Sequence, residues 1–214
     1  MLRPAFLALA LAAAAPSAAQ VATLPPADEA AADPSYLTFR SRLLAAAARH
    51  DTTAVLRAFA PTATVSFGAE ASGAAGVREV WLGPDGPGAA AFFAELAGTL
   101  GLGSAVDGEL VAAPSMFLRF PPEVDVFGHV IVTGESVLVR DAPSLSGAVL
   151  GSVSYAVLPV DAGRGYTDGW VPVRLATEER GWISARYVRE PLGYRVGMEK
   201  GPRGWQITFF VAGD

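Results

Sequence analysis

Between residues 130 and 188 the chain consists of short runs of β-branched and aromatic residues, each ended within a few positions by Gly, Pro, Ser or Asp. Such residues favour strands, and turn residues at these short intervals leave no room for a helix of useful length. Short, closely spaced strands bury their apolar side chains by folding into a small barrel. We therefore predict an all-β unit in this part of the chain.

The first part of the chain, residues 1–19, has the pattern of a secretory signal peptide. Arg3 provides a basic start, an uninterrupted Ala/Leu run covers 5–15, and small residues at 17–19 predict cleavage between Ala19 and Gln20. The apolar run is about half of the ~20 residues that a membrane-spanning helix requires. We expect a periplasmic or secreted protein with no membrane span in the mature chain.

Composition removes several function classes. The formal charge of −5 argues against a nucleic-acid partner. The absence of cysteine excludes disulfides, thiolate nucleophiles and cysteine-ligated metals. The two histidines, His50 and His129, lie in no metal-binding motif, and the chain has no Gly-x-Ser-x-Gly sequence. We predict a protein without a metal or cofactor and without catalytic activity.

A glycine-rich stretch over residues 68–76 invites comparison with phosphate-binding loops. It has neither the terminal Gly-Lys-Ser/Thr of a P-loop nor the Gly-x-Gly-x-x-Gly spacing of a dinucleotide fold. We expect a surface loop there, followed by a helical turn over 77–82.

The N-terminal half is predicted to begin with a leader and two helices. Residues 20–33 are rich in Ala, Pro and acidic residues without periodicity, which is typical of a flexible leader. Asp33 can accept hydrogen bonds from the free N–H groups of a helix that begins at Pro34 and covers 35–49. Asp51 can cap a second, shorter helix in the same way.

The rest of this half and the C-terminus combine a helix with extended segments, which predicts an α+β unit with an antiparallel sheet. A helix is expected over 89–100, and strand-like patterns occur at 62–67, 109–113 and 115–120. At the C-terminus, 194–200 and 205–211 alternate around a Gly-Pro-Arg-Gly turn and predict a β-hairpin.

Four segments in order make residues 130–188 resemble the bacterial SH3 (SH3b) family. They are VLVRDAPS at 137–144, AVLGSV at 148–153, GWVPV at 169–173 and RGWISARYV at 180–188. The resemblance implies a five-stranded, partly open barrel of the kind found in many exported proteins. The family usually has a glycine in the turn after the second strand, whereas this chain has Ser154-Tyr155, so we expect another turn type there.

The flanking segments resemble NTF2-like (cystatin-like) domains. The likeness rests on RHDTTAVL at 49–56, FAPTATVSFG at 59–68 and the closing GWQITFFV at 204–211. These matches lie on opposite sides of the barrel, which implies an α+β host interrupted by an inserted unit. The expected organisation is an α+β unit at 34–127, a barrel at 128–190 and a C-terminal hairpin at 191–214 that completes the first sheet.

The candidate binding residues are aromatics and one arginine of the barrel segment. SH3-like barrels expose aromatic side chains between their loops, where flat rings bury area at low entropic cost. Tryptophans that follow a glycine are equally suited to packing inside the barrel, so tyrosines on loops are the better candidates for exposure. The predicted ligand-binding residues are Tyr155, Tyr166, Trp170, Trp182 and Arg140.

The sequence supports three functions. The first is an exported non-catalytic protein whose barrel binds a peptide, a peptidoglycan fragment or an envelope protein. The second is an NTF2-like small-ligand binder or enzyme with the barrel as an accessory. The third is a purely structural barrel packed on its host. The candidate polar residues for an NTF2-like pocket are Tyr36, Glu70, Asp107 and Glu109.

Overall fold

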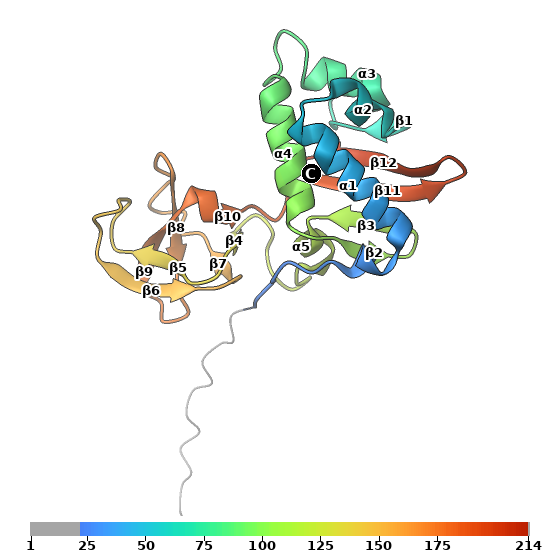
Figure 1. Ribbon diagram of the computed structural model, residues 1–214. Helices are drawn as coiled ribbons and strands as arrows, with labels where there is room; N and C mark the ends of the chain where they lie inside the picture. The colour runs from blue at the N-terminus through green and yellow to red at the C-terminus, as the bar shows by residue number, and fades with distance from the viewer. Residues whose placement is uncertain (1–21, 214) are drawn as a thin grey trace, which may run out of the picture.

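The computed structural model describes residues 22–213 and contains an α+β unit and an all-β unit (Figure 1). The predicted α+β fold class is confirmed. The predicted signal peptide and its cleavage position lie outside the described residues. In residues 22–213, no helix is both long and apolar enough to cross a membrane.

A five-stranded sheet forms the base of the α+β unit. Its strand order is β1 (Phe59–Thr64), β12 (Gly204–Val211), β11 (Arg195–Gly201), β3 (Leu110–Ala113) and β2 (Ala105–Asp107). The C-terminal hairpin β11–β12 therefore lies in the middle of this sheet, which it completes. The sheet is mixed rather than antiparallel, because β1 runs parallel to β12. Parallel neighbours need a long connection, and the rest of the chain provides it.

Helices cover the sheet and enclose the main core. They are α1 (Pro34–Ala48), α2 (Thr52–Arg57), α3 (Gly73–Val80) and α4 (Ala89–Gly101). The predicted caps are confirmed: the Asp33 carboxylate accepts from the Ser35 and Tyr36 N–H groups, and that of Asp51 accepts from Ala54 N–H. Fully buried side chains from helices and hairpin meet in one cluster that includes Tyr36, Phe92, Leu96, Met198 and Ile207.

Two local predictions for this unit were wrong. Residues 115–119 form a short helix, α5 (Ser115–Arg119), rather than an extended segment. Its Met116 is buried against the all-β unit, a contact that local pattern cannot reveal. The glycine-rich stretch is half helical, because α3 begins at Gly73. Gly73 has φ +56° and approaches β1 so closely that a Cβ would lie 2.6 Å from the Ala60 carbonyl oxygen.

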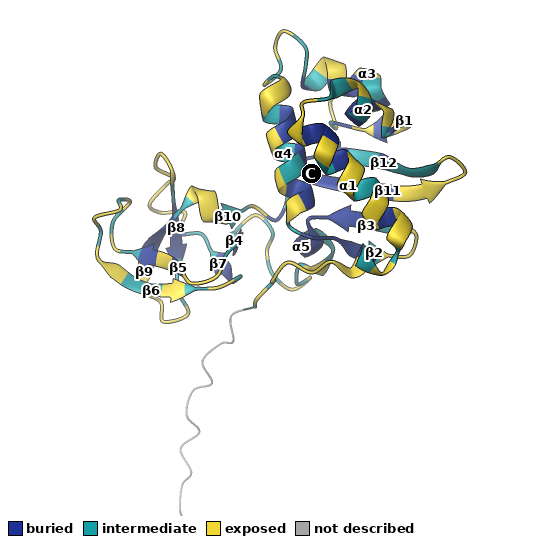
Figure 2. Ribbon diagram, in the orientation of Figure 1, coloured by how far each residue is buried: buried dark blue, intermediate teal, exposed yellow. Residues whose placement is uncertain are grey.

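The all-β unit consists of two small sheets. One has the order β10 (Val188–Arg189), β4 (His129–Val132), β7 (Val157–Pro159); the other is β6 (Val149–Val153), β5 (Val137–Arg140), β9 (Arg180–Ser184), β8 (Trp170–Arg174). A bridge between Val160 and Val173 joins them. Both sheets contribute to a common core of mostly valine side chains, and the exposed residues lie mainly on the loops and on β6 (Figure 2).

The chain enters and leaves the all-β unit on neighbouring strands. The entering strand β4 pairs with the leaving strand β10, with Val188 opposite Val132 and Arg189 opposite Ile131. Because its two ends lie side by side, the all-β unit interrupts the α+β unit without dividing the core of the latter.

Residues 22–33 are not the flexible leader that composition indicated. Thr23 bridges Ala156 of the all-β unit, and Leu24 N–H donates to the Tyr155 carbonyl at 2.7 Å. Glu29, in the 3-10 helix Glu29–Ala32, binds Arg119 of the α+β unit. This segment, here called the N-terminal strap, thus contacts both units. Ala22 and Leu24 also pack on a small apolar cluster that the two units share. These long-range contacts explain why the composition of this segment wrongly predicted a flexible leader.

Candidate functional site

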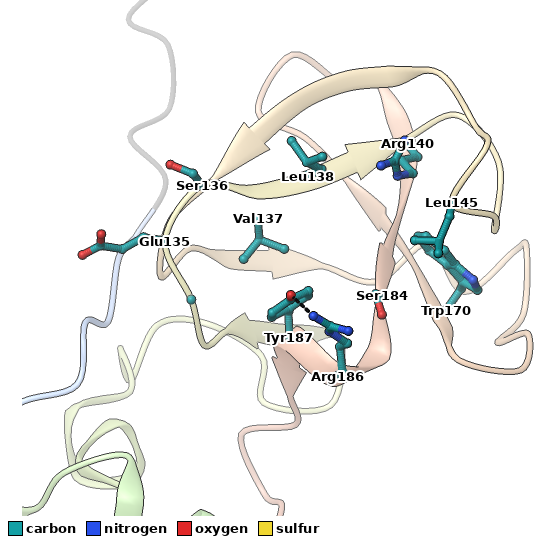
Figure 3. Close-up of a pocket in the computed structure, with 11 residues that line it drawn as sticks. Glu135, Ser136, Val137, Leu138, Arg140, Leu145, Trp170, Ser184, Arg186 and Tyr187 are labelled. Carbon is teal, nitrogen blue, oxygen red and sulfur yellow. Dashed lines mark hydrogen bonds between the residues drawn. The ribbon is translucent and has the colours of Figure 1, made fainter.

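A groove of about 400 Å³ lies on the outer face of the all-β unit (Figure 3). Three separate stretches of the chain form it: β5 with the turn before it and the loop after it, the start of β8, and the η2 turn (Ala185–Tyr187) with the end of β9 before it. We call it the β5 groove. The side chains that give it its chemistry are Leu138, Arg140, Leu145, Trp170, Arg186 and Tyr187.

Strand alternation places two of these side chains. In β5, Val137 and Val139 face the core, with exposed fractions of 6% and 0%, so Leu138 and Arg140 face outward. The Leu138 side chain is 42% exposed, and that of Leu145, on the following loop, is 80% exposed. The β5 groove therefore presents apolar side chains to solvent within one concave surface.

Two arginines supply the positive charge of the β5 groove. The Arg140 Nη1 donates to the Gly147 carbonyl at 2.7 Å, which holds the guanidinium beside the apolar surface and uses one of its five N–H donors. The Arg186 guanidinium lies 4.4 Å from the centre of the Tyr187 ring and donates to the Tyr187 hydroxyl. Glu135 is the acidic side chain that lines the same groove. The surface therefore favours an anionic group.

The five predicted ligand-binding residues fall in different places. Arg140 and Trp170 line the β5 groove. Trp182, opposite Arg140 in the sheet, is only 7% exposed, and the Arg164 guanidinium lies 5.9 Å from the centre of its ring. Tyr166 is 60% exposed but lines a different cleft. The structure thus brings together two of the five, and only one of the two predicted tryptophans lines the β5 groove.

Tyr155 has a backbone role rather than a place in the β5 groove. Its φ of +52° is the left-handed conformation that glycine adopts most easily. Its N–H donates to the carbonyl of Gly134, at the edge of the groove, and its carbonyl accepts from Leu24 of the N-terminal strap.

The predicted ligand-binding set did not include Leu138, Leu145, Arg186 or Tyr187. The alternation in VLVR at 137–140 contained a signal for Leu138, since the residue between two core valines must face outward. For Leu145 and Arg186 the signal is tertiary, because the loop and the η2 turn come together only through the pairing of β5 with β9.

The α+β unit has a groove of its own, of about 440 Å³, between the N-terminal strap and the hairpin. Glu29, Glu109, Lys200 and Trp205 are among its lining residues. Of the polar residues considered for an NTF2-like pocket, Glu109 lies here, whereas Tyr36 is buried in the core. Glu70 and Asp107 are exposed, and they line none of the three cavities described here. The structure therefore does not bring these four residues together.

Within residues 22–213, no group of three or more His, Asp or Glu side chains is arranged to hold a metal ion. Comparison of the chain with protein-family models, with curated proteins and with solved structures finds no match in any of the three. The SH3b and NTF2-like resemblances therefore stay predictions, and the geometry of the site carries the functional argument.

Proposed function

We propose that this is an exported, non-catalytic binding protein of SH3b-like type whose β5 groove takes a short extended peptide with a free carboxylate. The observation that carries the proposal is the concave surface in which exposed Leu138 and Leu145 lie beside the guanidinium of Arg140. Apolar side chains in a groove bury ligand surface, while a few placed polar groups orient the ligand.

The apolar and aromatic side chains of the β5 groove supply contact area for a ligand. Trp170 and Tyr187 present rigid rings, which lose little conformational entropy when a ligand covers them. Figure 3 shows Leu145 beside Trp170 and shows Arg186 beside Tyr187. A peptide lying across β5 would therefore meet an apolar end and an aromatic, charged end.

The charged part supplies orientation. Guanidinium groups form paired hydrogen bonds with carboxylates, which a neutral amide cannot match. Arg140 keeps donors beyond the one used by Gly147. The two arginines outnumber the single lining carboxylate of Glu135, which favours a ligand with a negative end.

The proposal is tested with immobilised tripeptides in two matched sets, one ending in a free carboxylate and one in an amide. We expect retention of the carboxylate set, and about tenfold weaker binding for Arg186→Gln, since a charge-assisted hydrogen bond contributes roughly 1.5–3 kcal/mol. The matched control is Arg203→Gln, in the β11–β12 hairpin turn. Equal retention of the two sets would contradict the carboxylate preference.

The contribution of the apolar side chains to peptide binding is tested by a separate pair of variants. Leu145→Ser should weaken binding, whereas Val149→Ser should not, because Val149 is also exposed (52%) but does not line the β5 groove. Purified peptidoglycan and soluble protein C-termini both carry carboxylate-ended peptides, so competition between them identifies the source. Unchanged binding by both variants would argue against this groove.

One observation favours the purely structural alternative as second candidate. Met116 of α5 packs with Ile131 and Val157 of the all-β unit in a shared cluster, so the two units are joined by buried apolar side chains. If no carboxylate-ended peptide binds and disruption of this cluster unfolds both units together, the all-β unit acts as a structural insert.

A further inference from the structure

A third cavity, of about 350 Å³, lies at the junction of the two units. It is lined by residues 126–129, where the chain enters the all-β unit, by residues 190–193, where the chain leaves it, and by 212–213. Tyr166, on a loop of the all-β unit, completes it. We call it the junction cleft. Since both connecting segments form its walls, it exists only when the two units are folded together.

Two exposed aromatic side chains belong to the junction cleft. Phe127 is 75% exposed and Tyr166 is 60% exposed. Among the described aromatic residues only Phe67 is comparably exposed. A single exposed aromatic ring is ordinary, but two at one cleft offer π faces to a ligand without help from the rest of the surface.

Two side chains of the junction cleft, Glu190 and His129, offer hydrogen-bond acceptors. Glu190 contributes an exposed carboxylate. The Nδ1 of His129 lies 2.8 Å from the Asp125 carbonyl oxygen, and because a carbonyl only accepts, Nδ1 carries the proton. In the neutral ring, Nε2 is then an acceptor. The Glu190 charge, after burial, also helps to raise the pKa of Tyr166, which indicates negative potential at that ring.

No lysine or arginine lines the junction cleft among the residues described. The two arginines of the neighbouring chain segments have protein partners. Arg195 donates to the carbonyls of Leu192 and Gly213 and packs 5.0 Å from the Phe117 ring centre. Arg189 donates to Glu95 and Thr99 on α4. The cleft therefore presents acceptors and aromatic faces, which suit a cation and disfavour an anion.

We propose that the junction cleft binds an alkylammonium group, such as the side-chain amine of a lysine or other diamino acid in a peptide. The ammonium would lie against the Phe127 and Tyr166 rings, whose faces attract cations. Its three N–H donors match the acceptors of Glu190 and His129. The site is separate from the β5 groove and does not depend on the function proposed for it.

The test uses two probes on the full chain: Nα-acetyl-lysine methylamide and its uncharged analogue Nα-acetyl-norleucine methylamide. Titration followed by NMR should shift the signals of Phe127, Tyr166 and His129 with the lysine probe, and at least about tenfold more weakly with norleucine. Glu190→Gln should weaken lysine-probe binding about tenfold, since the carboxylate gives the charge-assisted contact. Glu178→Gln, on an exposed turn of the all-β unit, is the matched control and should change nothing.

Substitution of the rings separates recognition from folding. Tyr166→Phe keeps the π face and should retain binding, while Tyr166→Ala should weaken it about threefold or more. Equal affinity for both probes, or no effect of Glu190→Gln, would overturn the proposal in favour of a purely apolar cleft. Shifts at the same residues with a disaccharide of N-acetylglucosamine but not with the lysine probe would overturn it in favour of a sugar site.

Discussion

The carboxylate of Glu95, on α4, lies 3.2 Å from Nη2 of Arg189, on β10. The same Nη2 donates to the Thr99 hydroxyl at 3.0 Å and to the Tyr194 carbonyl. Arg189 ends β10, the last strand of the all-β unit, and Glu95 and Thr99 belong to a helix that packs on the first sheet (Figure 1). This contact fastens the exit from the inserted unit to its host.

Arg189→Met should lower the free energy of unfolding by about 2 kcal/mol, because it removes hydrogen bonds from a charged donor that is only 16% exposed. Denaturation in guanidinium chloride at neutral pH measures this loss in the free energy of unfolding. Arg186→Met, three positions earlier and exposed, should cost no more than about 0.5 kcal/mol. Equal costs for the two would show that the contact with Glu95 contributes nothing specific.

Gly181→Ala should destabilise the protein by about 2 kcal/mol. A Cβ at Gly181 would lie 2.4 Å from the Val139 Cγ1 and 3.0 Å from the Arg140 carbonyl oxygen, so a buried valine and the backbone of β5 would have to move. Gly151→Ala, in β6 of the same sheet, is the control, since its Cβ would meet nothing within 4 Å. That control should be neutral or stabilising by up to about 1 kcal/mol. A thermal-unfolding shift of the same sign for both variants would contradict the steric explanation.

Ser136→Gly should stabilise the protein by about 0.5 kcal/mol. Ser136, at the edge of the β5 groove, has φ +50°, a conformation that costs a residue with a Cβ roughly 1–2 kcal/mol and glycine almost nothing. Its N–H bond to Ser154 Oγ would remain. Ser152→Gly, in the regular strand β6, should instead destabilise by about 0.5–1 kcal/mol. Chemical denaturation of the two variants decides whether the sign reverses between them.

Acid should loosen the N-terminal strap. Hydrogen bonds from Arg119 and from the Val106 N–H hold the pKa of Glu29 below its ordinary value of 4.5. Because the folded pKa is lowered, this stabilisation is present above about pH 4.5 and is lost as the pH falls through the lowered pKa.

Hydrogen exchange at the Leu24 and Ala27 amides, which bond to Tyr155 and Ser115, reports on the strap. Protection should decrease on acidification in the wild type. In Glu29→Gln the protection of these amides should be weaker and should depend less on pH. The control Glu178→Gln should behave like the wild type. A Glu29→Gln profile parallel to that of the wild type would show that another group anchors the strap.

The sequence pattern predicted correctly the features that depend only on residues close together in the chain. Asp33 and Asp51 begin helices because a side-chain oxygen beside a free backbone N–H satisfies it wherever the chain lies. The same reasoning failed for Met116, whose helix packs on a unit that follows it in the chain, and for the N-terminal strap, whose polar composition gave no sign of its partners.

The sequence by itself determined that short strands occupy residues 130–188, that helices precede them and that a hairpin closes the chain, because these follow from turn residues and apolar period. Only the tertiary structure decided which faces became sites. Leu145, Trp170 and Arg186 share a groove through strand pairing, Trp182 is covered and lies outside that groove, and Tyr166 lies beside Glu190 where the two units meet. Such neighbours arise from contacts between segments far apart in the chain, which no local pattern records.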